Sequence, residues 1–198
     1  MQFKVIEPGI EASGASIGAF VEAFKLFPSV ISRKLTKNGI GKPVGKHDIE
    51  VDPNVWYPQQ AWLTAWEEIA TEIGPRACYQ IGRHLPKHAV FPPTVTDIHS
   101  GVASVDVAYH LNHRKNGKVM FDLATGRKTN GIGNYGYQPV QGERRIISVC
   151  DNPYPCDFDR GILTEISNRF ERTARLVHDE QSSCRKNGAS SCTYTIVW

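Results

Sequence analysis

A group of cysteines in the C-terminal third of the chain constrains the fold more than any other feature. Cys184 and Cys192 flank the dipeptide Asn187-Gly188, a strong signal for a tight turn between two antiparallel strands. If two strands meet at this turn, the two thiols stand close together at the ends of the hairpin. Cys156, on the approach to a predicted helix, could be brought beside them. Three clustered thiols indicate either a metal site or a redox site.

Zinc is one candidate occupant of such a cluster. A structural zinc site is closed and tetrahedral, with four ligands drawn from Cys, His, Asp or Glu. The three cysteines supply three ligands, and the fourth could come from His178, Asp179 or Glu180. Cys156 stands 28 positions before Cys184, so the spacing differs from the paired Cys-x-x-Cys signature. A zinc site, a disulfide between the two hairpin cysteines and free thiols therefore all stay open.

Length and composition favour a single domain over residues 1–198. Of these 198 residues, 40% are hydrophobic and 22% charged, which suffices to bury a core. The sequence has no apolar run of ~18 residues and no signal-peptide core. We therefore expect a cytoplasmic protein with reduced or metal-bound cysteines and no membrane segment. The net charge of +3 is too small to indicate nucleic-acid binding.

The first half of the chain predicts helices. A short strand is expected at residues 3–7. After it, apolar residues recur at helical spacing in these segments: 16–27, 28–38, 58–74, 76–88 and 94–113. Trp62 and Trp66 lie one turn apart on the third helix, where they either fill the core or wall a ligand pocket. The fifth helix carries Tyr109 on its apolar face.

The second half predicts an antiparallel sheet. Glycines, tyrosines and β-branched residues replace the helical pattern and favour strands at residues 118–123, 133–140 and 144–151. A closing hairpin pairs residues 175–181 with 191–198. In its last strand the two-residue period places four side chains on one face: Cys192, Tyr194, Ile196 and Trp198.

One helix is inserted before this closing hairpin. Asp157 or Asp159 can cap it, and Ile162, Ile166 and Phe170 share one of its faces. The order of the elements indicates an α+β fold. We expect a helical N-terminal half, followed by an antiparallel sheet with one inserted helix and a C-terminal hairpin.

His110 and His113, three positions apart near the end of the fifth helix, form a second candidate site. Histidines at this spacing can bind a metal, and a single histidine can bind haem iron. A polar edge between helix and strand also explains them. No Cys-x-x-Cys-His motif for covalent haem attachment is present.

No catalytic motif stands out from the sequence. A Gly-x-Ser-x-Gly elbow is absent. Cys78 and Cys150 fall inside a predicted helix and a predicted strand, where they are expected to pack in the core. The adjacent carboxylates Glu67 and Glu68 belong on a solvated helix face. The sequence thus favours a binding protein over an enzyme.

The C-terminal stretch resembles a known family. A cysteine is followed by a glycine five positions later, a phenylalanine nine further on, an acidic residue, and two cysteines separated by seven residues. The residues that meet this pattern are Cys156, Gly161, Phe170, Glu180, Cys184 and Cys192. The pattern is similar to the 4-vinyl reductase domain, the sensory domain of bacterial aromatic-responsive activators, also found in a bacteriochlorophyll-pathway protein. Related folds occur in haem-based nitric-oxide sensors and in a Golgi-transport subunit.

The resemblance implies a usually dimeric ligand-binding domain with a small-molecule pocket between helices and sheet. In the sensor members, three cysteines and a glutamate hold zinc beside the pocket. Here they correspond to Cys156, Cys184, Cys192 and Glu180. The family places its acidic residue three positions before the first hairpin cysteine, where this chain has Gln181. A bulge could restore Glu180, Asp179 or His178 could substitute, or the metal could be lost.

The resemblance also points to a ligand pocket lined from the long helix and the strand that follows it. Together with the aromatic residues of the helices, the candidate ligand-binding residues are Trp62, Trp66, Tyr109, His110, His113, Tyr135 and Tyr137.

Two functions follow from these observations. The first is a regulatory sensor domain that binds a small apolar or aromatic ligand, carries zinc, forms a homodimer and signals to a downstream protein. The second is a haem or tetrapyrrole-binding protein, either a gas sensor or an accessory protein of pigment synthesis. In that case His110 or His113 is the axial ligand. A scaffold domain with a structural metal and no ligand is a third, simpler interpretation.

Overall fold

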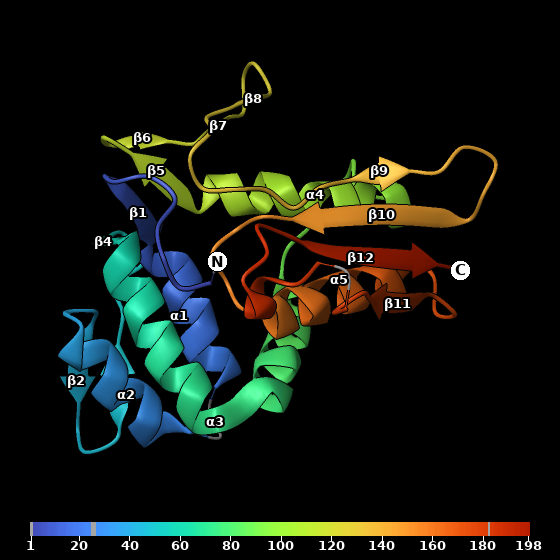
Figure 1. The fold of residues 1–198 in the computed structure, drawn as a ribbon. Coiled ribbons are helices and arrows are strands. Elements are labelled where there is room, and N and C mark those ends of the chain that lie inside the picture. The colour runs from blue at the N-terminus through green and yellow to red at the C-terminus, as the bar shows by residue number, and fades with distance from the viewer. Residues whose placement is uncertain (1, 25–26, 182) are drawn as a thin grey trace. The chain divides into compact units, whose positions relative to one another are not determined.

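The computed structural model describes residues 2–24, 27–181 and 183–198. The chain divides into two compact units (Figure 1), each made of discontinuous segments. The N-terminal unit holds residues 3–77 and 110–132, and the C-terminal unit holds residues 78–109 and 133–198. Among the described helices, none combines the length and the apolar composition needed to cross a bilayer.

The N-terminal unit combines helices with short antiparallel strands. Its helices are α1 (Gly14–Ala23), α2 (Pro28–Lys37) and the first part of α3 (Gln59–His88). A four-stranded sheet has the order β4 (Trp56–Pro58), β1 (Ile10–Ser13), β5 (His113–Lys115) and β6 (Lys118–Val119). Two hairpins complete the unit: β2 (Lys42–Val44) with β3 (Asp48–Glu50), and β7 (Phe121–Asp122) with β8 (Arg127–Lys128).

The helices begin where local chemistry favours it. Ser13 caps α1, because its hydroxyl accepts a hydrogen bond from the Ser16 amide at 3.1 Å. Pro28 starts α2 in a first turn that needs no amide donor. The two helices predicted at 58–74 and 76–88 are the halves of α3, and Gly74 separates them with a left-handed φ of +79°. The first predicted helix includes residues 25–26, which lie outside the described residues.

Two strand predictions in this unit were wrong. Residues 3–7 form no strand, and the first strand lies at Ile10–Ser13 instead. The Gln60 side chain forms hydrogen bonds with the backbone of this irregular segment: it accepts from the Val5 amide and donates to the Phe3 carbonyl. The strand expected at 118–123 is split at buried Met120, so that β6 pairs with β5 and β7 pairs with β8.

The C-terminal unit confirms the predicted α+β organisation. Its antiparallel sheet has the order β11 (Arg175–His178), β12 (Cys192–Val197), β10 (Arg145–Cys150) and β9 (Gln138–Pro139). Residues 98–109 of α4 (Ile98–Leu111), the end of α3 and all of α5 (Cys156–Phe170) supply its helices. In β12, Cys192, Tyr194 and Ile196 are buried and alternate with partly exposed residues, as the two-residue period predicts.

The capping prediction for α5 was wrong. Pro155 occupies the cap position without a side-chain hydrogen bond, and Asp157 and Asp159 lie within the first turn. In this first turn their negative charges still interact favourably with the positive end of the α5 helix dipole. Asp159 is fully buried and makes long-range contacts instead.

Close approach of two helices explains a pair of glycines in the C-terminal unit. A Cβ atom on Gly161 of α5 would lie 2.2 Å from the Tyr79 carbonyl oxygen, and one on Gly82 of α3 would lie 2.1 Å from the Phe158 carbonyl oxygen. Only glycine therefore allows the two backbones to touch here. This packing gives a physical reason for the glycine in the C-terminal sequence pattern.

We expect Gly161→Ala to lower the free energy of unfolding by about 1–3 kcal/mol, because the added methyl group must push the helices apart. Gly18→Ala is the matched control, since Gly18 lies in helix α1 with no atom within 4 Å of an added Cβ. It should stabilise the protein by about 0.5–1 kcal/mol. Urea denaturation followed by circular dichroism measures both; equal effects would contradict the packing argument.

Candidate metal centre

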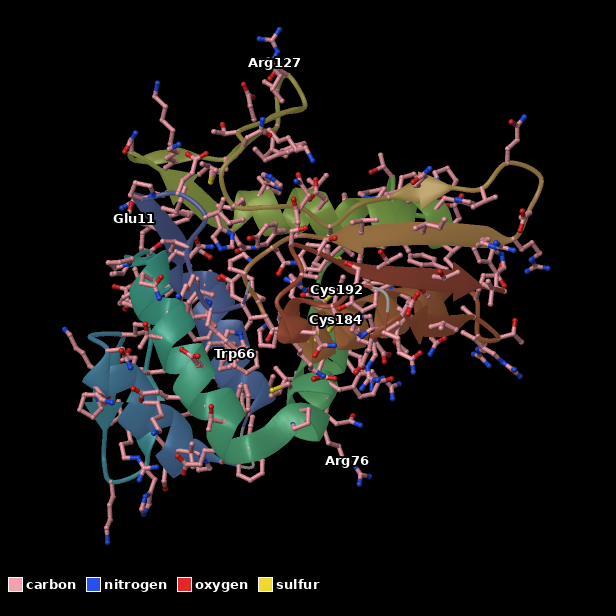
Figure 2. The ribbon with its side chains drawn as sticks, in the orientation of Figure 1. Glu11, Trp66, Arg76, Arg127, Cys184 and Cys192 are labelled. Atoms are coloured by element: carbon pink, nitrogen blue, oxygen red, sulfur yellow. The ribbon has the colours of Figure 1, made fainter. Side chains whose placement is uncertain are left out.

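Three thiols and one imidazole converge in the C-terminal unit. Cys156 is the first residue of α5, His178 the last of β11 and Cys192 the first of β12, while Cys184 directly precedes a short 3₁₀ turn at Arg185–Asn187. Their ligand atoms all lie within 4.8 Å of one another. The Cys184 and Cys192 side chains lie next to each other in Figure 2. All three thiols are free and buried.

The loop between β11 and β12 brings the two hairpin cysteines together. The Asn187 and Ala189 amides both donate to the Cys184 carbonyl, at 2.9 and 3.2 Å, so the chain reverses directly after this cysteine. Gly188 completes the turn with a φ of +86°, which glycine adopts without strain. The predicted hairpin is confirmed, since β11 and β12 pair in antiparallel register. Its connection is longer than a two-residue turn.

The sulfur spacing matches a tetrahedral metal site. The Cys184 Sγ atom lies 3.8 Å from the Cys156 Sγ and 3.9 Å from the Cys192 Sγ. Zn–S bonds of ~2.3 Å at a tetrahedral angle place two sulfur ligands ~3.8 Å apart. A disulfide requires an S–S distance of ~2.05 Å. The described geometry thus fits a shared metal ion.

His178 occupies the fourth position of the group. Its side chain is 2% exposed, both ring nitrogens are buried, and the ring makes a hydrogen bond with the Cys192 thiol. The Glu180 carboxylate, predicted as the fourth ligand, is 46% exposed and lies 3.3 Å from the His178 Nδ1 atom. It is placed to orient the imidazole, as carboxylates do beside metal-bound histidines. Asp179 is exposed.

The environment of Cys192 favours a thiolate. Hydrogen bonds from the Cys156 thiol, from His178 and from Arg185 lower the pKa of Cys192 well below its usual range, although burial opposes this effect. Arg185 donates twice to this sulfur, from its backbone amide at 3.3 Å and from Nε at 3.4 Å. Metal ligation by cysteine requires the thiolate form, so the charge needed for binding is already stabilised here.

Arg185 also forms a buried ion pair with Asp159. Both side chains are 0% exposed, and the guanidinium bonds to the Asp159 carboxylate and to Asn152. The Tyr135 hydroxyl and the Asn152 amide donate to the same carboxylate, at 2.6 and 3.1 Å. Burial raises the pKa of Asp159 to about 6, while Arg185 and Tyr135 oppose this rise. The three donors that face this carboxylate, from Arg185, Tyr135 and Asn152, favour its ionised form.

This network reaches helix α4. The Tyr135 amide donates to the Asp106 carboxylate on α4 at 2.8 Å, while the Tyr135 hydroxyl reaches Asp159 on α5. A continuous chain of polar contacts thus runs from the Cys192 sulfur through Arg185 and Asp159 to Tyr135 and Asp106. The sequence missed Arg185, Asn152 and Asp159 as site residues. Arg185 stands three positions before the turn glycine Gly188, and an arginine at such a turn is usually expected to be solvated.

None of the predicted ligand-binding residues belongs to the group formed by the three cysteines and His178. Trp62 and Trp66 pack edge-on against the Phe20 ring in the N-terminal unit, with ring centroids 4.7 and 4.6 Å away. His110 and His113 are buried in the same unit, at 1% and 3% exposure.

The predicted tyrosines belong to the C-terminal unit. The Tyr109 and Tyr135 rings meet edge to face at 5.3 Å. The Tyr137 hydroxyl lies 3.0 Å from the His99 Nδ1 atom. A ligand-binding role for any of these seven residues stays a prediction.

Arg185→Met should lower the free energy of unfolding by about 3–5 kcal/mol, because it leaves the Asp159 carboxylate buried without its counter-charge. Arg33→Gln is the control. Arg33 pairs with Glu72 at 2.9 Å and both side chains are exposed, at 64% and 40%, so its loss should cost less than about 1 kcal/mol. Chemical denaturation compares the two, and a similar small cost for both would show that the buried pair contributes little.

No known protein family matches the sequence, and no curated protein matches it. Solved structures do match, and several of them are H-NOX proteins. The Fe(II) unliganded H-NOX protein from K. algicida aligns with a TM-score of 0.61 at 10% identity, covering 93% of this chain and 95% of that one. The Shewanella oneidensis H-NOX domain in the Fe(II)CO state gives 0.58 at 15%, with 93% and 97% covered. A study of porphyrin distortion and haem redox potential supplies a third, at 0.57 and 13%, with 94% and 99% covered. This chain therefore has an H-NOX-like fold, whereas the comparisons do not show the 4-vinyl reductase family.

Proposed function

We propose that this chain is a haem-binding sensor domain with a zinc ion at its C-terminal sheet. The observation that carries the haem function is the likeness, over more than nine-tenths of the chain, to H-NOX structures that include Fe(II) states and one from a study that probed haem distortion. It favours haem over the apolar or aromatic ligand implied by the 4-vinyl reductase resemblance. Binding of a ligand would change the conformation of the domain, and a downstream signalling protein would respond to this change. The five free thiols support a reducing, cytoplasmic location.

The residues present fit haem in their donor chemistry. Haem iron takes an axial imidazole nitrogen in many proteins, and His110 and His113 are buried imidazoles at the end of α4 and the start of β5. Either would hold the iron from one side. When bound, the haem supplies an open coordination position for a small gas. The protein's own contribution is to shield the imidazole from water and fix its position on the helix end.

The zinc proposal stands on the donor set. Three cysteines and His178 would supply four protein ligands to one ion, and a site without an open position is structural rather than catalytic. Such an ion would tie together the start of α5, the end of β11 and the start of β12. Arg185 would offset the negative charge that three thiolates and one Zn²⁺ leave behind.

Metal analysis by mass spectrometry tests the zinc site on protein purified without a metal-affinity tag. We expect about one zinc per chain, lost in Cys184→Ser and His178→Ala. Cys78→Ser is the thiol control and should retain the metal, since Cys78 is buried outside the group. Glu180→Gln should also retain it. Loss of zinc in Glu180→Gln with retention in His178→Ala would instead make the carboxylate the ligand.

Reconstitution with haem followed by absorbance spectroscopy tests the sensor function. The ferrous protein should show a Soret band that shifts when carbon monoxide is added. His110→Ala or His113→Ala should change the spectrum of the carbon monoxide-free form, because the axial nitrogen is lost. His99→Ala is the control, since His99 lies on the same helix beside the Tyr137 hydroxyl. A colourless protein, or a spectrum unchanged in the double variant of His110 and His113, would overturn the proposal.

A further inference from the structure

The sheet of the C-terminal unit has a covered inner face. Its inward residues include Tyr194, whose hydroxyl donates to the Cys156 carbonyl of α5 at 2.8 Å. Helix α4 lies on the same side, because Asp106 accepts from Tyr135 while the Tyr135 hydroxyl reaches Asp159 of α5. The end of α3 contacts α5 in turn, through Gly82 and Gly161. In Figure 1 α5 lies beside β11 and β12.

The opposite, outer face presents β-branched side chains. Cross-strand partners share a face of an antiparallel sheet, and the register aligns Val149 with Thr193 and Val177 with Thr195. Val149 is 41% exposed and Val177 is 60% exposed. We define the outer face by its outward residues on β10, β11 and β12: Arg145, Ile147, Val149, Arg175, Val177, Thr193, Thr195 and Val197.

Opposite charges mark the two ends of this outer face. Arg145 and Arg175 both lie opposite Val197, so they flank one end, where Arg145 also pairs with Glu143 at 2.6 Å. At the other end the alternation continues to Asp179, whose amide still pairs with the Thr193 carbonyl, and to Asp151 after β10. The outward residues of β10 and of β11 therefore follow the same order along each strand: an arginine, then apolar residues, then an aspartate.

We propose that the outer face is a homodimer interface, covered by the same face of a second copy. Consider two copies with their outer faces packed together. A two-fold axis that lies between the two sheets and is perpendicular to the strands places β11 of one copy on β11 of the other, with the two strands antiparallel. Each arginine end then meets an aspartate end, and the β-branched centres pack together. An axis parallel to the strands would instead set arginines against arginines. Of these two orientations, only the first sets opposite charges against each other, and this self-complementarity favours a second copy as the occupant.

Charge reversal on β11 tests this interface independently of zinc and haem. Arg175→Asp makes both ends of the strand acidic, and Asp179→Arg makes both ends basic. Sedimentation equilibrium of the full chain should show a dimer for the wild type, weakened by added salt. Each variant alone should dimerise about tenfold more weakly or worse, because like charges now meet. An equimolar mixture of the two variants should restore dimerisation, since the acidic face complements the basic one.

Two further variants control for folding and for non-specific apolar association. Val177→Lys should abolish the dimer by placing a charge at the centre of the face, whereas Val90→Ser, at a residue that is 98% exposed, should leave it unchanged. Circular dichroism confirms that each variant is folded, which matters for Asp179 because it adjoins His178. A monomeric wild type at every concentration, or a dimer unaffected by Val177→Lys, would overturn the proposal. Failure of the mixture to recover would do the same.

Discussion

The buried ion pair between Arg185 and Asp159 is the contact on which the C-terminal unit depends. Two opposite charges with no exposed side-chain surface must each be compensated, because an unpaired charge in a protein interior costs several kcal/mol. Asn152, Tyr135 and the Cys192 sulfur use the remaining donors and acceptors of the pair. The loop between β11 and β12, the start of α5 and the edge of the sheet are thereby held in one arrangement.

This arrangement explains why the candidate metal ligands and the polar network occur together. The thiolate at Cys192 needs a nearby positive group, and the guanidinium of Arg185 needs negative partners on both sides. The arginine lies directly after Cys184 in the chain, so closing the turn brings the thiols together and buries the guanidinium in one event. Such a site is preorganised, because the protein and not the ion supplies most of its order.

Local signals predicted much of this fold from the sequence, and long-range contacts account for the errors. Helical periodicity located α3 and α5, and the Asn187-Gly188 turn with three cysteines predicted the group they form in space. The short sheet around β1 was missed, because its partner β5 lies about 100 positions away. Whether a turn arginine is buried, or which of three adjacent side chains faces the thiols, depends on packing that no sequence window contains.

The discontinuous units have a consequence for how the chain folds during synthesis. Strand β1 pairs with β5, Ile10 opposite Lys115, so the N-terminal unit is incomplete until residues 110–132 have left the ribosome. By then residues 78–109, which belong to the other unit, are already exposed. Domain-by-domain folding from the N-terminus is therefore ruled out by topology. Until then the edge of β1 that pairs with β5 lacks its partner strand.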